Sequence, residues 1–343
     1  GVDVFTGFSG SELLLDGDRV IGVRTGERGI SRSGEKKSTY EPGVDIHAKV
    51  TVLADGVRGN LTKMLIGRYG LDAGRTPQTY AIGIKELWET TTTRLAPGSV
   101  VHTMGYPLGF DQFGGGFVYA LDDRRLSVGF VTGLDYRDPL FDPHEAFQRF
   151  KSHPKVSALL KQGEMVRYGA KALPEGGWHA IPRSHVDGAL VVGDAAGYLN
   201  SMRLKGIHLA MESGLCAADV AFCAIQEQDT SCARLSQYAA LVEDGPIRKE
   251  LYPVRNVHQS FTAGLFSGLA FSALSLVTGG WWLRDPLPSE PGHQRMKQIR
   301  DRPDRTEVQK RQIVRSDQNV TFDKLTNVHF SGVRHEEDQP SHL

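Results

Sequence analysis

The stretch Leu190-Val191-Val192-Gly193-Asp194-Ala195-Ala196-Gly197 decides the fold, because a short apolar run ends abruptly in Gly-Asp. We interpret the run as a buried strand. Gly193 at its carboxyl end allows a tight turn, and Asp194 is placed to accept a hydrogen bond from a ligand hydroxyl, such as those of a ribityl chain. The alternative is an ordinary junction between a strand and a turn, with no ligand.

A helix predicted from about Gly206 to Ile225 follows this turn, and Lys205-Gly206-Ile207-His208 opens it. The first N–H groups of a helix have no partner within the helix, and its amino end carries a partial positive charge. Such an end suits an electron-rich carbonyl, such as the O2 atom of a flavin. The glycine-opened helix therefore favours the ligand interpretation of Gly193 and Asp194.

A second unit of strand, loop and helix lies earlier in the chain. Val50 to Ala54 predicts a strand, Asp55-Gly56 a turn, and Leu61 to Ile66 a helix. An ordinary Asp-Gly turn explains this pattern equally well. Between the two units, strand-like runs alternate with a helix at about Pro143 to His153. We therefore expect an α/β nucleotide-binding domain that is interrupted by an α+β insertion.

Composition excludes several classes of function. The chain has 343 residues, 40% hydrophobic and 23% charged, with 40 basic and 40 acidic side chains. These values are typical of a folded globular protein, and the absence of a long basic block argues against nucleic acid as a partner. Cys216, Cys223 and Cys232 have neither CxxC nor paired disulfide spacing, so we expect no metal site on this chain.

Six dispersed segments together resemble the electron transfer flavoprotein:ubiquinone oxidoreductase family. They occur in the family's order along nearly the whole chain. The segments are YEPGVDIHAK (40–49), PQTYAIGIKELW (77–88), FGGGFVY (113–119), EGGW (175–178), KELYPVRN (249–256) and HEEDQPSHL (335–343). The resemblance implies a discontinuous FAD-binding domain of the glutathione-reductase type, joined to a quinone- and membrane-binding domain.

The resemblance also implies a set of site residues, cofactors and partners. FAD is expected at the turns around Asp55-Gly56 and Gly193-Asp194, and ubiquinone at the backbone of Gly114 and Gly115. Electrons are expected to come from electron transfer flavoprotein and to pass through FAD and a [4Fe-4S] cluster, whose ligands are expected beyond Leu343. Further residues expected near the flavin ring are Asn200, Lys205, Gly206 and Ile207.

The chain departs from the family pattern at three places. Ile207 and Leu209 stand where a small hydroxyl residue commonly follows the Lys-Gly pair, so a side-chain hydrogen bond to the flavin is not expected there. Ser201-Met202-Arg203 replaces the commoner Val-Pro-Lys. No GxGxxG loop for the adenosine diphosphate precedes these motifs, so we expect the chain to be a fragment that binds FAD poorly alone.

A stretch from Gln259 to Leu283 carries no charged residue. Its length approaches the roughly 20 residues of a transmembrane helix, yet several glycines and serines make it only moderately apolar. We expect it to lie in one leaflet; a transmembrane span and a buried helix of a soluble protein are the alternatives. The residues expected to contact the membrane are Phe261, Leu265, Phe266, Leu269, Trp281 and Trp282.

A basic stretch follows, and anionic lipid head groups would attract it at about 1 kcal/mol per residue; a solvated linker is the alternative. Its basic residues are Arg295, Lys297, Arg300, Arg302, Arg305, Lys310, Arg311 and Arg315. The family resemblance implies a monotopic protein on the matrix face of the mitochondrial inner membrane or on the cytoplasmic face of a bacterial inner membrane.

Five segments follow from these patterns. We expect FAD-domain residues at 1–75, the quinone-binding insertion at 76–170, the FAD-domain return at 171–235, a helical membrane and quinone region at 236–330, and the start of an iron–sulfur domain at 331–343. Two other functions stay open: a related FAD-dependent hydroxylase or geranylgeranyl-reductase-like enzyme, and a non-enzymatic, membrane-bound remnant.

Overall fold

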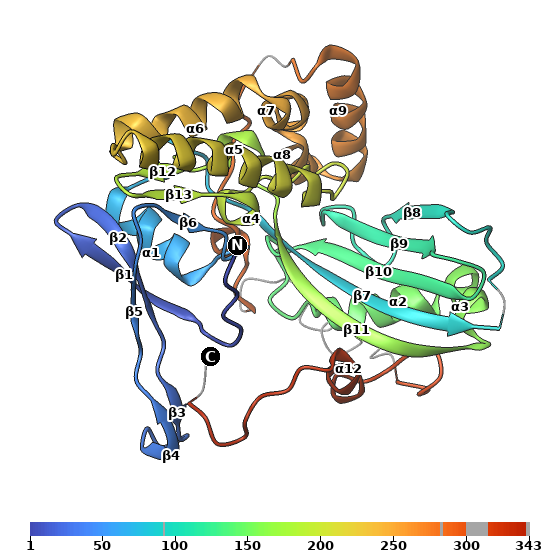
Figure 1. Cartoon of the computed structure of the whole chain (residues 1–343). Coiled ribbons are helices and arrows are strands. Elements are labelled where there is room, and N and C mark those ends of the chain that lie inside the picture. Colours follow the sequence, from blue (N-terminus) through green and yellow to red (C-terminus); the bar gives the residue numbers. More distant parts are fainter. Residues whose placement is uncertain (92, 282–283, 300–314, 341–343) are drawn as a thin grey trace. The chain divides into compact units, whose positions relative to one another are not determined.

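The computed structural model describes residues 1–91, 93–281, 284–299 and 315–340, which form two compact units (Figure 1). Unit 1 comprises residues 1–76, 177–255 and 334–343, and unit 2 comprises 77–176 and 256–333. The boundary expected between residues 235 and 236 is wrong, because it falls inside helix α6 (Cys232–Asp244). The chain leaves unit 1 only after Arg255.

Unit 1 contains three small sheets. The first two are the antiparallel sheet β1-β2-β5 and the hairpin β3-β4. Gly17, with φ +59°, makes the Asp-Gly turn between β1 and β2. The strands of these sheets are β1 (Gly10–Asp16), β2 (Arg19–Thr25), β3 (Arg28–Ile30), β4 (Lys36–Glu41) and β5 (Asp45–His47).

The third sheet of unit 1 joins two distant parts of the chain. Strand β13 (Ala189–Val191) pairs in parallel with β6 (Thr51–Leu53), and β12 (His185–Val186) lies beyond β13. All three residues of β13 are fully buried, which fits a strand covered on both faces. Because parallel strands end at the same edge of a sheet, the turns after β6 and β13 lie side by side.

Helices complete unit 1, and α5 and α6 lie over the β12-β13-β6 sheet in Figure 1. Helix α5 buries Leu209, Ala217 and Val220 along one side. Tyr238 on α6 donates a hydrogen bond of 3.2 Å from its hydroxyl to the Val191 carbonyl, which ties α6 to β13. The helices are α1 (Asn60–Tyr69), α4 (Gly193–Ala196), α5 (Ile207–Gln226), α6 and α7 (Pro246–Leu251), with 3-10 turns at Trp178–Ala180 and Tyr252–Val254.

Unit 2 is built on one antiparallel sheet with the strand order β11-β7-β10-β9-β8. Its core lies under helix α2, where the Phe147 and Phe150 rings pack against Val128 and Phe130 of the sheet. A Cβ at Gly116 would lie 2.2 Å from the Phe150 ring, so glycine is needed there. The strands are β7 (Tyr80–Thr90), β8 (Val100–Met104), β9 (Gly114–Ala120), β10 (Arg125–Gly133) and β11 (Gly163–Pro174).

Helix α2 begins where the sequence predicts a helix, because Asp142 caps it and accepts hydrogen bonds from the N–H groups of His144 and Glu145. Pro143 occupies the first helical turn, where no backbone donor is needed. The helices of unit 2 are α2 (Pro143–Ser152), α3 (Pro154–Leu160), α8 (Val257–Ser260), α9 (Leu265–Thr278), α10 (Gly292–Arg295) and α12 (Lys324–Ser331), with a 3-10 turn at Phe261–Ala263.

The charge-free stretch forms α8, a 3-10 turn and α9 rather than one long helix. Helix α9 has 14 residues, about 21 Å at 1.5 Å per residue, which is shorter than a roughly 30 Å hydrocarbon core. Among the described residues, only α5 is both long and apolar enough to cross a membrane by length and composition. Since α5 packs in unit 1, this test is weak evidence for a membrane span.

Candidate functional site

At the turn after β13, the backbone of Gly193 lies close to helix α5. Gly193 has φ +59°, a conformation that favours glycine, and its N–H donates to the Ser213 hydroxyl on α5 at 2.9 Å. A Cβ at position 193 would lie only 3.2 Å from the Cβ of Ala210, also on α5. Glycine therefore brings the start of α5 against the half-buried Asp194.

The loop from Asn200 to Lys205 is closed by its own backbone. The Asn200 N–H donates to the Lys205 carbonyl at 2.9 Å. The Asn200 side-chain oxygen accepts from the Arg203 N–H at 3.1 Å, which fixes the turn from inside. The loop delivers the chain directly to Gly206, the residue before α5. The structure thus brings Gly193, Asp194 and the Asn200–Lys205 loop together around one helix start.

Glu250 on α7 connects the Asn200–Lys205 loop to the first turn of α5 through hydrogen bonds. The sequence analysis assigned Glu250 no role. Its two carboxylate oxygens bond the Asn200 amide at 3.0 Å and the His208 ring at 2.7 Å. Although partial burial opposes the effect, the hydrogen bonds from His208 and Asn200 lower the pKa of Glu250. Glu250 therefore holds the loop and the first turn of α5 in a fixed relation.

The start of α5 fits the carbonyl edge of a flavin. No side chain among the described residues caps it, and its first turn contains no acidic residue. A Cβ at Gly206 would approach the Tyr198 carbonyl to 3.2 Å, so glycine keeps this end compact. Ile207 is 82% exposed. The backbone N–H groups of the first turn are thus available to an anionic or electron-rich ligand.

Asp55 occupies the predicted turn after β6 but already caps a helix. Its carboxylate accepts hydrogen bonds from the Thr62 N–H at 3.1 Å and from the Thr62 hydroxyl, both in the first part of α1. Gly59 leaves room for this contact, since a Cβ there would overlap the Asp55 carboxylate. Gly56 has φ +77°, which suits glycine. The carboxylate of Asp55 therefore serves to cap α1, whereas Asp194 lies beside the glycine-opened helix α5.

Gly114 and Gly115 begin strand β9 between β8 and β10. A Cβ at Gly115 would lie 2.0 Å from the Thr103 carbonyl, and a Cβ at Gly114 would lie 2.2 Å from the Val131 carbonyl. Gly114 also has φ +145°. The close approach of neighbouring strands therefore explains both glycines. A side chain added by Gly115→Val would meet the backbone of β8, so this substitution would disturb the sheet as well as any ligand at this position.

A buried ionic cluster lies beside the start of β9. His258 on α8 is hydrogen-bonded through Nδ1 to Glu175 at 2.9 Å and through Nε2 to Asp135 at 3.3 Å. Its imidazole ring lies 4.4 Å, centroid to centroid, from the Phe113 ring. Although burial alone would lower it, the bonds to the two carboxylates raise the pKa of His258 to about 9. The sequence analysis assigned no role to the side chains of these residues.

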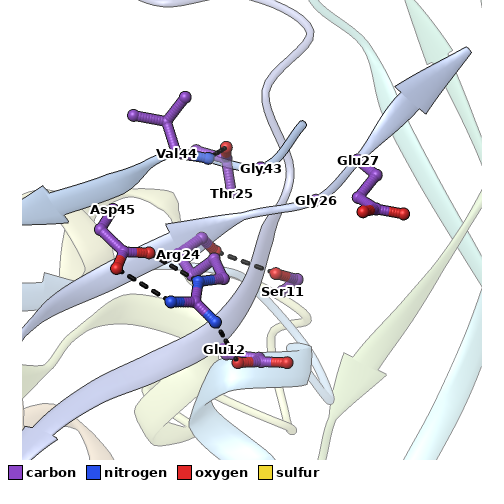
Figure 2. A pocket seen from close by; sticks show the side chains of 9 residues that line it. All are labelled: Ser11, Glu12, Arg24, Thr25, Gly26, Glu27, Gly43, Val44 and Asp45. Atoms are coloured by element: carbon purple, nitrogen blue, oxygen red, sulfur yellow. Dashed lines mark hydrogen bonds and ion pairs between the residues drawn. The ribbon is translucent and has the colours of Figure 1, made fainter. Parts of the chain in front are cut away.

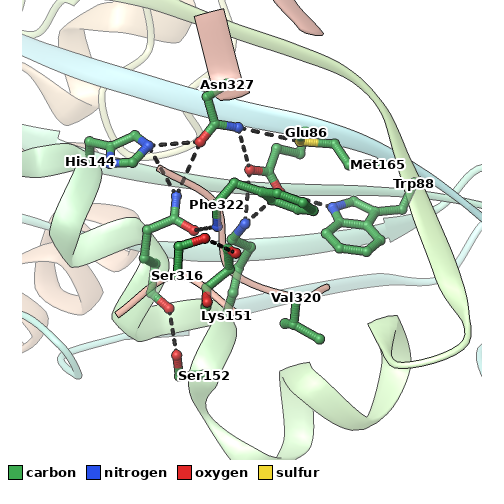
Figure 3. A network of polar contacts seen from close by, with 12 residues as sticks. Glu86, Trp88, His144, Lys151, Ser152, Met165, Ser316, Val320, Phe322 and Asn327 are labelled. Atoms are coloured by element: carbon green, nitrogen blue, oxygen red, sulfur yellow. Dashed lines mark hydrogen bonds and ion pairs between the residues drawn. The ribbon is translucent and has the colours of Figure 1, made fainter. Parts of the chain in front are cut away.

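A second buried cluster, shown in Figure 3, surrounds Glu86 on β7. Lys151 on α2 donates to both carboxylate oxygens at 2.9 Å. Trp88 Nε1 donates to one oxygen at 2.9 Å, and the Asn327 amide donates to the other at 3.0 Å. Burial lowers the pKa of Lys151 even though Glu86 opposes this. These bonds pin α2 and α12 to the sheet and leave each oxygen of Glu86 with two donors.

The residues expected to contact the membrane differ in their solvent exposure. Phe261 is 4% exposed, so its expected membrane contact is wrong: its ring packs on Gly268 and, at 5.0 Å between centroids, on Phe113. Leu265 is half-buried. Phe266, Leu269 and Trp281 are exposed, and Trp282 lies outside the described residues. Most of the basic stretch, residues 300–314, also lies outside them.

Phe266 on α9 stacks on Phe110 with 5.8 Å between ring centroids. Both side chains are exposed, at 75% and 69%. The Leu265 N–H donates to the Phe110 carbonyl at 2.7 Å, which holds the start of α9 beside the loop before β9. An exposed aromatic pair is therefore fixed next to the Gly114 region.

A surface hollow of about 780 Å³ lies in unit 1, away from the predicted site residues (Figure 2). Arg24 lies at its centre and bonds Asp45 at 2.6 and 2.9 Å. Glu12 also pairs with Arg24 at 3.6 Å. The hollow's central cation is thus committed to neighbouring carboxylates, and we assign this hollow no role. Its lining is Ser11, Glu12, Arg24, Thr25, Gly26, Glu27, Gly43, Val44 and Asp45.

Comparison with known sequences gives a consistent result. Residues 80–173 match the family model described as ETF-QO, ubiquinone-binding. Along its whole length the chain is 38% identical to the mitochondrial electron transfer flavoprotein-ubiquinone oxidoreductase of Arabidopsis thaliana, 40% to that of Caenorhabditis elegans and 36% to that of Homo sapiens. It covers 53%, 58% and 56% of these proteins, so it spans little more than half their length.

Solved structures show the same fold at low sequence identity. A geranylgeranyl bacteriochlorophyll reductase-like protein from Thermoplasma acidophilum aligns with a TM-score of 0.59 and 16% identity, over 88% of this chain and 68% of that one. A flavin-dependent brominase aligns with a TM-score of 0.52 and 17% identity, over 80% and 64%. The mixed α/β architecture is thus consistent with an FAD-binding fold.

Proposed function

We propose that the chain belongs to the family of electron transfer flavoprotein-ubiquinone oxidoreductases and that it forms the flavin- and quinone-binding part of such an enzyme. The complete enzyme would pass electrons from reduced electron transfer flavoprotein to ubiquinone. Similarity to the relatives along the whole chain and the ubiquinone-binding match at residues 80–173 support this proposal.

The parallel pairing of β6 with β13 carries the flavin part of the proposal, because it places the two expected flavin turns at one sheet edge. We assign FAD to this edge, with Asp55 and Gly56 at one turn and Gly193 and Asp194 at the other. FAD supplies reversible electron transfer when bound. The chain's own contribution is to position it, through Asn200, Lys205, Gly206 and Ile207 at the start of α5.

We place the quinone head group at Gly114 and Gly115, within the segment that matches the ubiquinone-binding family model. Both glycines lie in an ordered strand, which would give a bound ring a rigid surface. The half-buried ring of Phe113 directly precedes them and packs on Phe261. An aromatic surface beside an ordered strand suits a planar, largely apolar substrate.

Two further parts of the proposal concern the complete protein. A [4Fe-4S] cluster would be held by cysteines beyond Leu343, as the family resemblance implies. The exposed side chains of Phe266, Leu269 and Trp281 would contact a membrane surface beside the quinone region. Because its relatives are named as mitochondrial proteins, we extend the mitochondrial location to this chain and favour a monotopic protein on the matrix face of the inner membrane.

The flavin assignment is tested by comparing Asp194→Ala with Asp55→Ala in the complete protein. We expect Asp194→Ala to lower the flavin content per folded molecule more strongly, because Asp55 is committed to capping α1 through Thr62. Flavin absorbance is measured against protein concentration, and the thermal midpoint of each variant shows which loss comes from unfolding. Asp55→Ala should mainly lower the midpoint. Equal flavin content in both variants contradicts the ranking.

The quinone assignment is tested by activity. The complete, flavin-loaded protein should reduce a soluble ubiquinone analogue when reduced electron transfer flavoprotein is the donor. The control replaces that donor with reduced nicotinamide nucleotides. A reaction driven only by nicotinamide overturns the proposal and favours a hydroxylase or reductase function.

A further inference from the structure

His258 lies between two carboxylates in the interior of unit 2. Both ring nitrogens face acceptors, Glu175 at 2.9 Å and Asp135 at 3.3 Å, so the ring donates at both ends when it is protonated. Arg295 on α10 forms a further ion pair with the same Asp135 oxygen. Although burial opposes the effect, His258 and Arg295 lower the pKa of Asp135, whereas burial raises the pKa of Glu175.

The cluster runs from the edge of the unit to its interior. The side chain of Asp135 is 9% exposed, that of His258 2% and that of Glu175 0%. Asp135 follows β10, His258 lies on α8 and Glu175 follows β11, so three elements build the line. A single file of titratable groups that leads from the surface inward is an arrangement suited to proton transfer.

The inner end of the line has an oxygen without a partner. Oε1 of Glu175 is buried and accepts no hydrogen bond from the described residues, and the same holds for Oε1 of the neighbouring Gln259. Buried polar atoms are nearly always hydrogen-bonded, so an orphan oxygen indicates an absent partner. This buried oxygen is therefore open to a proton or to a polar ligand.

The cluster also borders the expected quinone region. The Phe113 ring lies 4.4 Å from the His258 ring, and the Phe113 carbonyl accepts from the Gly133 N–H at 2.9 Å, two residues before Asp135. Gly114 follows Phe113 directly in the chain. The imidazole therefore packs against the side chain of the residue that directly precedes β9.

We infer that Asp135, His258 and Glu175 form a proton relay for quinone reduction. The inference rests on the proposed function, which supplies two electrons. Each quinone oxygen must then gain one proton to give the quinol. In each transfer the Nδ1–H bond of protonated His258 breaks and Glu175 takes up the proton. The new O–H bond of Glu175 then breaks as the quinol O–H bond forms, and solvent restores the His258 proton through the Asp135 end.

The charged groups that face His258 are Asp135 and Glu175, while Arg295 faces Asp135 from α10. A purely structural cluster would hold α8 to the ends of β10 and β11 and would have no effect on a particular electron acceptor. A relay, by contrast, matters only to acceptors that take up protons. This difference separates the two roles.

The test compares two electron acceptors in the complete, flavin-loaded enzyme: a soluble ubiquinone analogue, which takes up protons, and ferricyanide, which does not. We expect Glu175→Gln to lower the rate of quinone reduction about 100-fold, the lower end of the range for loss of a general acid, and to leave ferricyanide reduction within about twofold. Asp135→Asn should act in the same direction but more weakly. The wild-type quinone rate should also fall as the pH rises through about 9, with no matching fall for ferricyanide.

Asn327→Leu is the matched control, because Asn327 is as buried as the relay residues and contacts Glu86 instead. It should lower the stability of the protein, and it should not change the rate of quinone reduction relative to that of ferricyanide reduction. The relay is overturned if Glu175→Gln keeps the wild-type quinone rate, or if it slows both acceptors equally. If the wild-type enzyme reduces ferricyanide but no quinone, the proposed function itself fails and the relay fails with it.

Discussion

The two buried ionic clusters of unit 2 differ in how completely their carboxylates are hydrogen-bonded. Glu86 has four donor contacts, two from Lys151 and one each from Trp88 and Asn327. Glu175 has a single bonded oxygen, which faces His258, and its other oxygen has no partner among the described residues. Both carboxylates are fully buried. Burial alone therefore does not separate them.

The difference indicates different roles. A saturated cluster has no site left for a ligand or proton, and its geometry fixes one arrangement of α2, α12 and β7. In an unsaturated cluster, a buried oxygen without a hydrogen-bond partner destabilises the fold. Such a loss of stability is tolerated where the carboxylate takes part in function. We therefore interpret the Glu86 cluster as structural and the Glu175 cluster as functional.

The largest expected effect is that of Lys151→Met, which should lower the free energy of unfolding by about 3 to 5 kcal/mol, because it leaves the Glu86 carboxylate buried without its cation. Unfolding by urea, followed by intrinsic fluorescence, measures the loss. The double variant Glu86→Leu/Lys151→Met is the control and should recover most of the stability. A loss below about 1 kcal/mol in the single variant means that Glu86 is not held as an ion.

The sequence predicts the elements of both units well. The strand and turn around Gly193, the strand at residues 51–53 and the helices at 143–152 and 207–226 lie close to their expected positions. Each depends on local signals: a buried apolar run, an Asp-Gly turn or a capped helix start. The parallel pairing of β6 with β13 agrees with the expected interrupted domain.

The roles that depend on tertiary contacts could not be predicted. Glu250 and His258 become significant only when helices distant in sequence bring them to Asn200 and Glu175. Phe261 and Phe266 lie in the same charge-free stretch, yet Phe261 is buried because Gly268 leaves room for its ring. Absence of charge predicts that a stretch is apolar but not which of its side chains face the protein.

The second expected effect is a pH dependence of stability that comes from His258. Its folded pKa, about 9, lies above the ordinary value of 6.5, so the protonated ring stabilises the fold fully below about pH 6.5. This stabilisation, about 3 kcal/mol, should be lost as the pH rises through about 9. Urea unfolding at about pH 6 and about pH 9.5 measures it. His258→Gln should remove this part of the pH dependence, and an unchanged slope in that variant contradicts the assignment.

The smallest expected effect is that of Glu175→Gln, which should change the free energy of unfolding by less than about 1 kcal/mol. The amide oxygen can still accept the His258 bond, and the amide NH2 takes the place of the oxygen that has no partner. Removing the buried charge stabilises the folded variant, while removing a counter-ion of His258 destabilises it.

The same substitution at Glu86 places an NH2 group against the donors Lys151 and Trp88 and should lower the free energy of unfolding by about 2 to 4 kcal/mol. Parallel urea titrations of the two variants decide the comparison: equal losses mean that Glu175 is as completely bonded as Glu86, and that its second oxygen is not held ready for a proton.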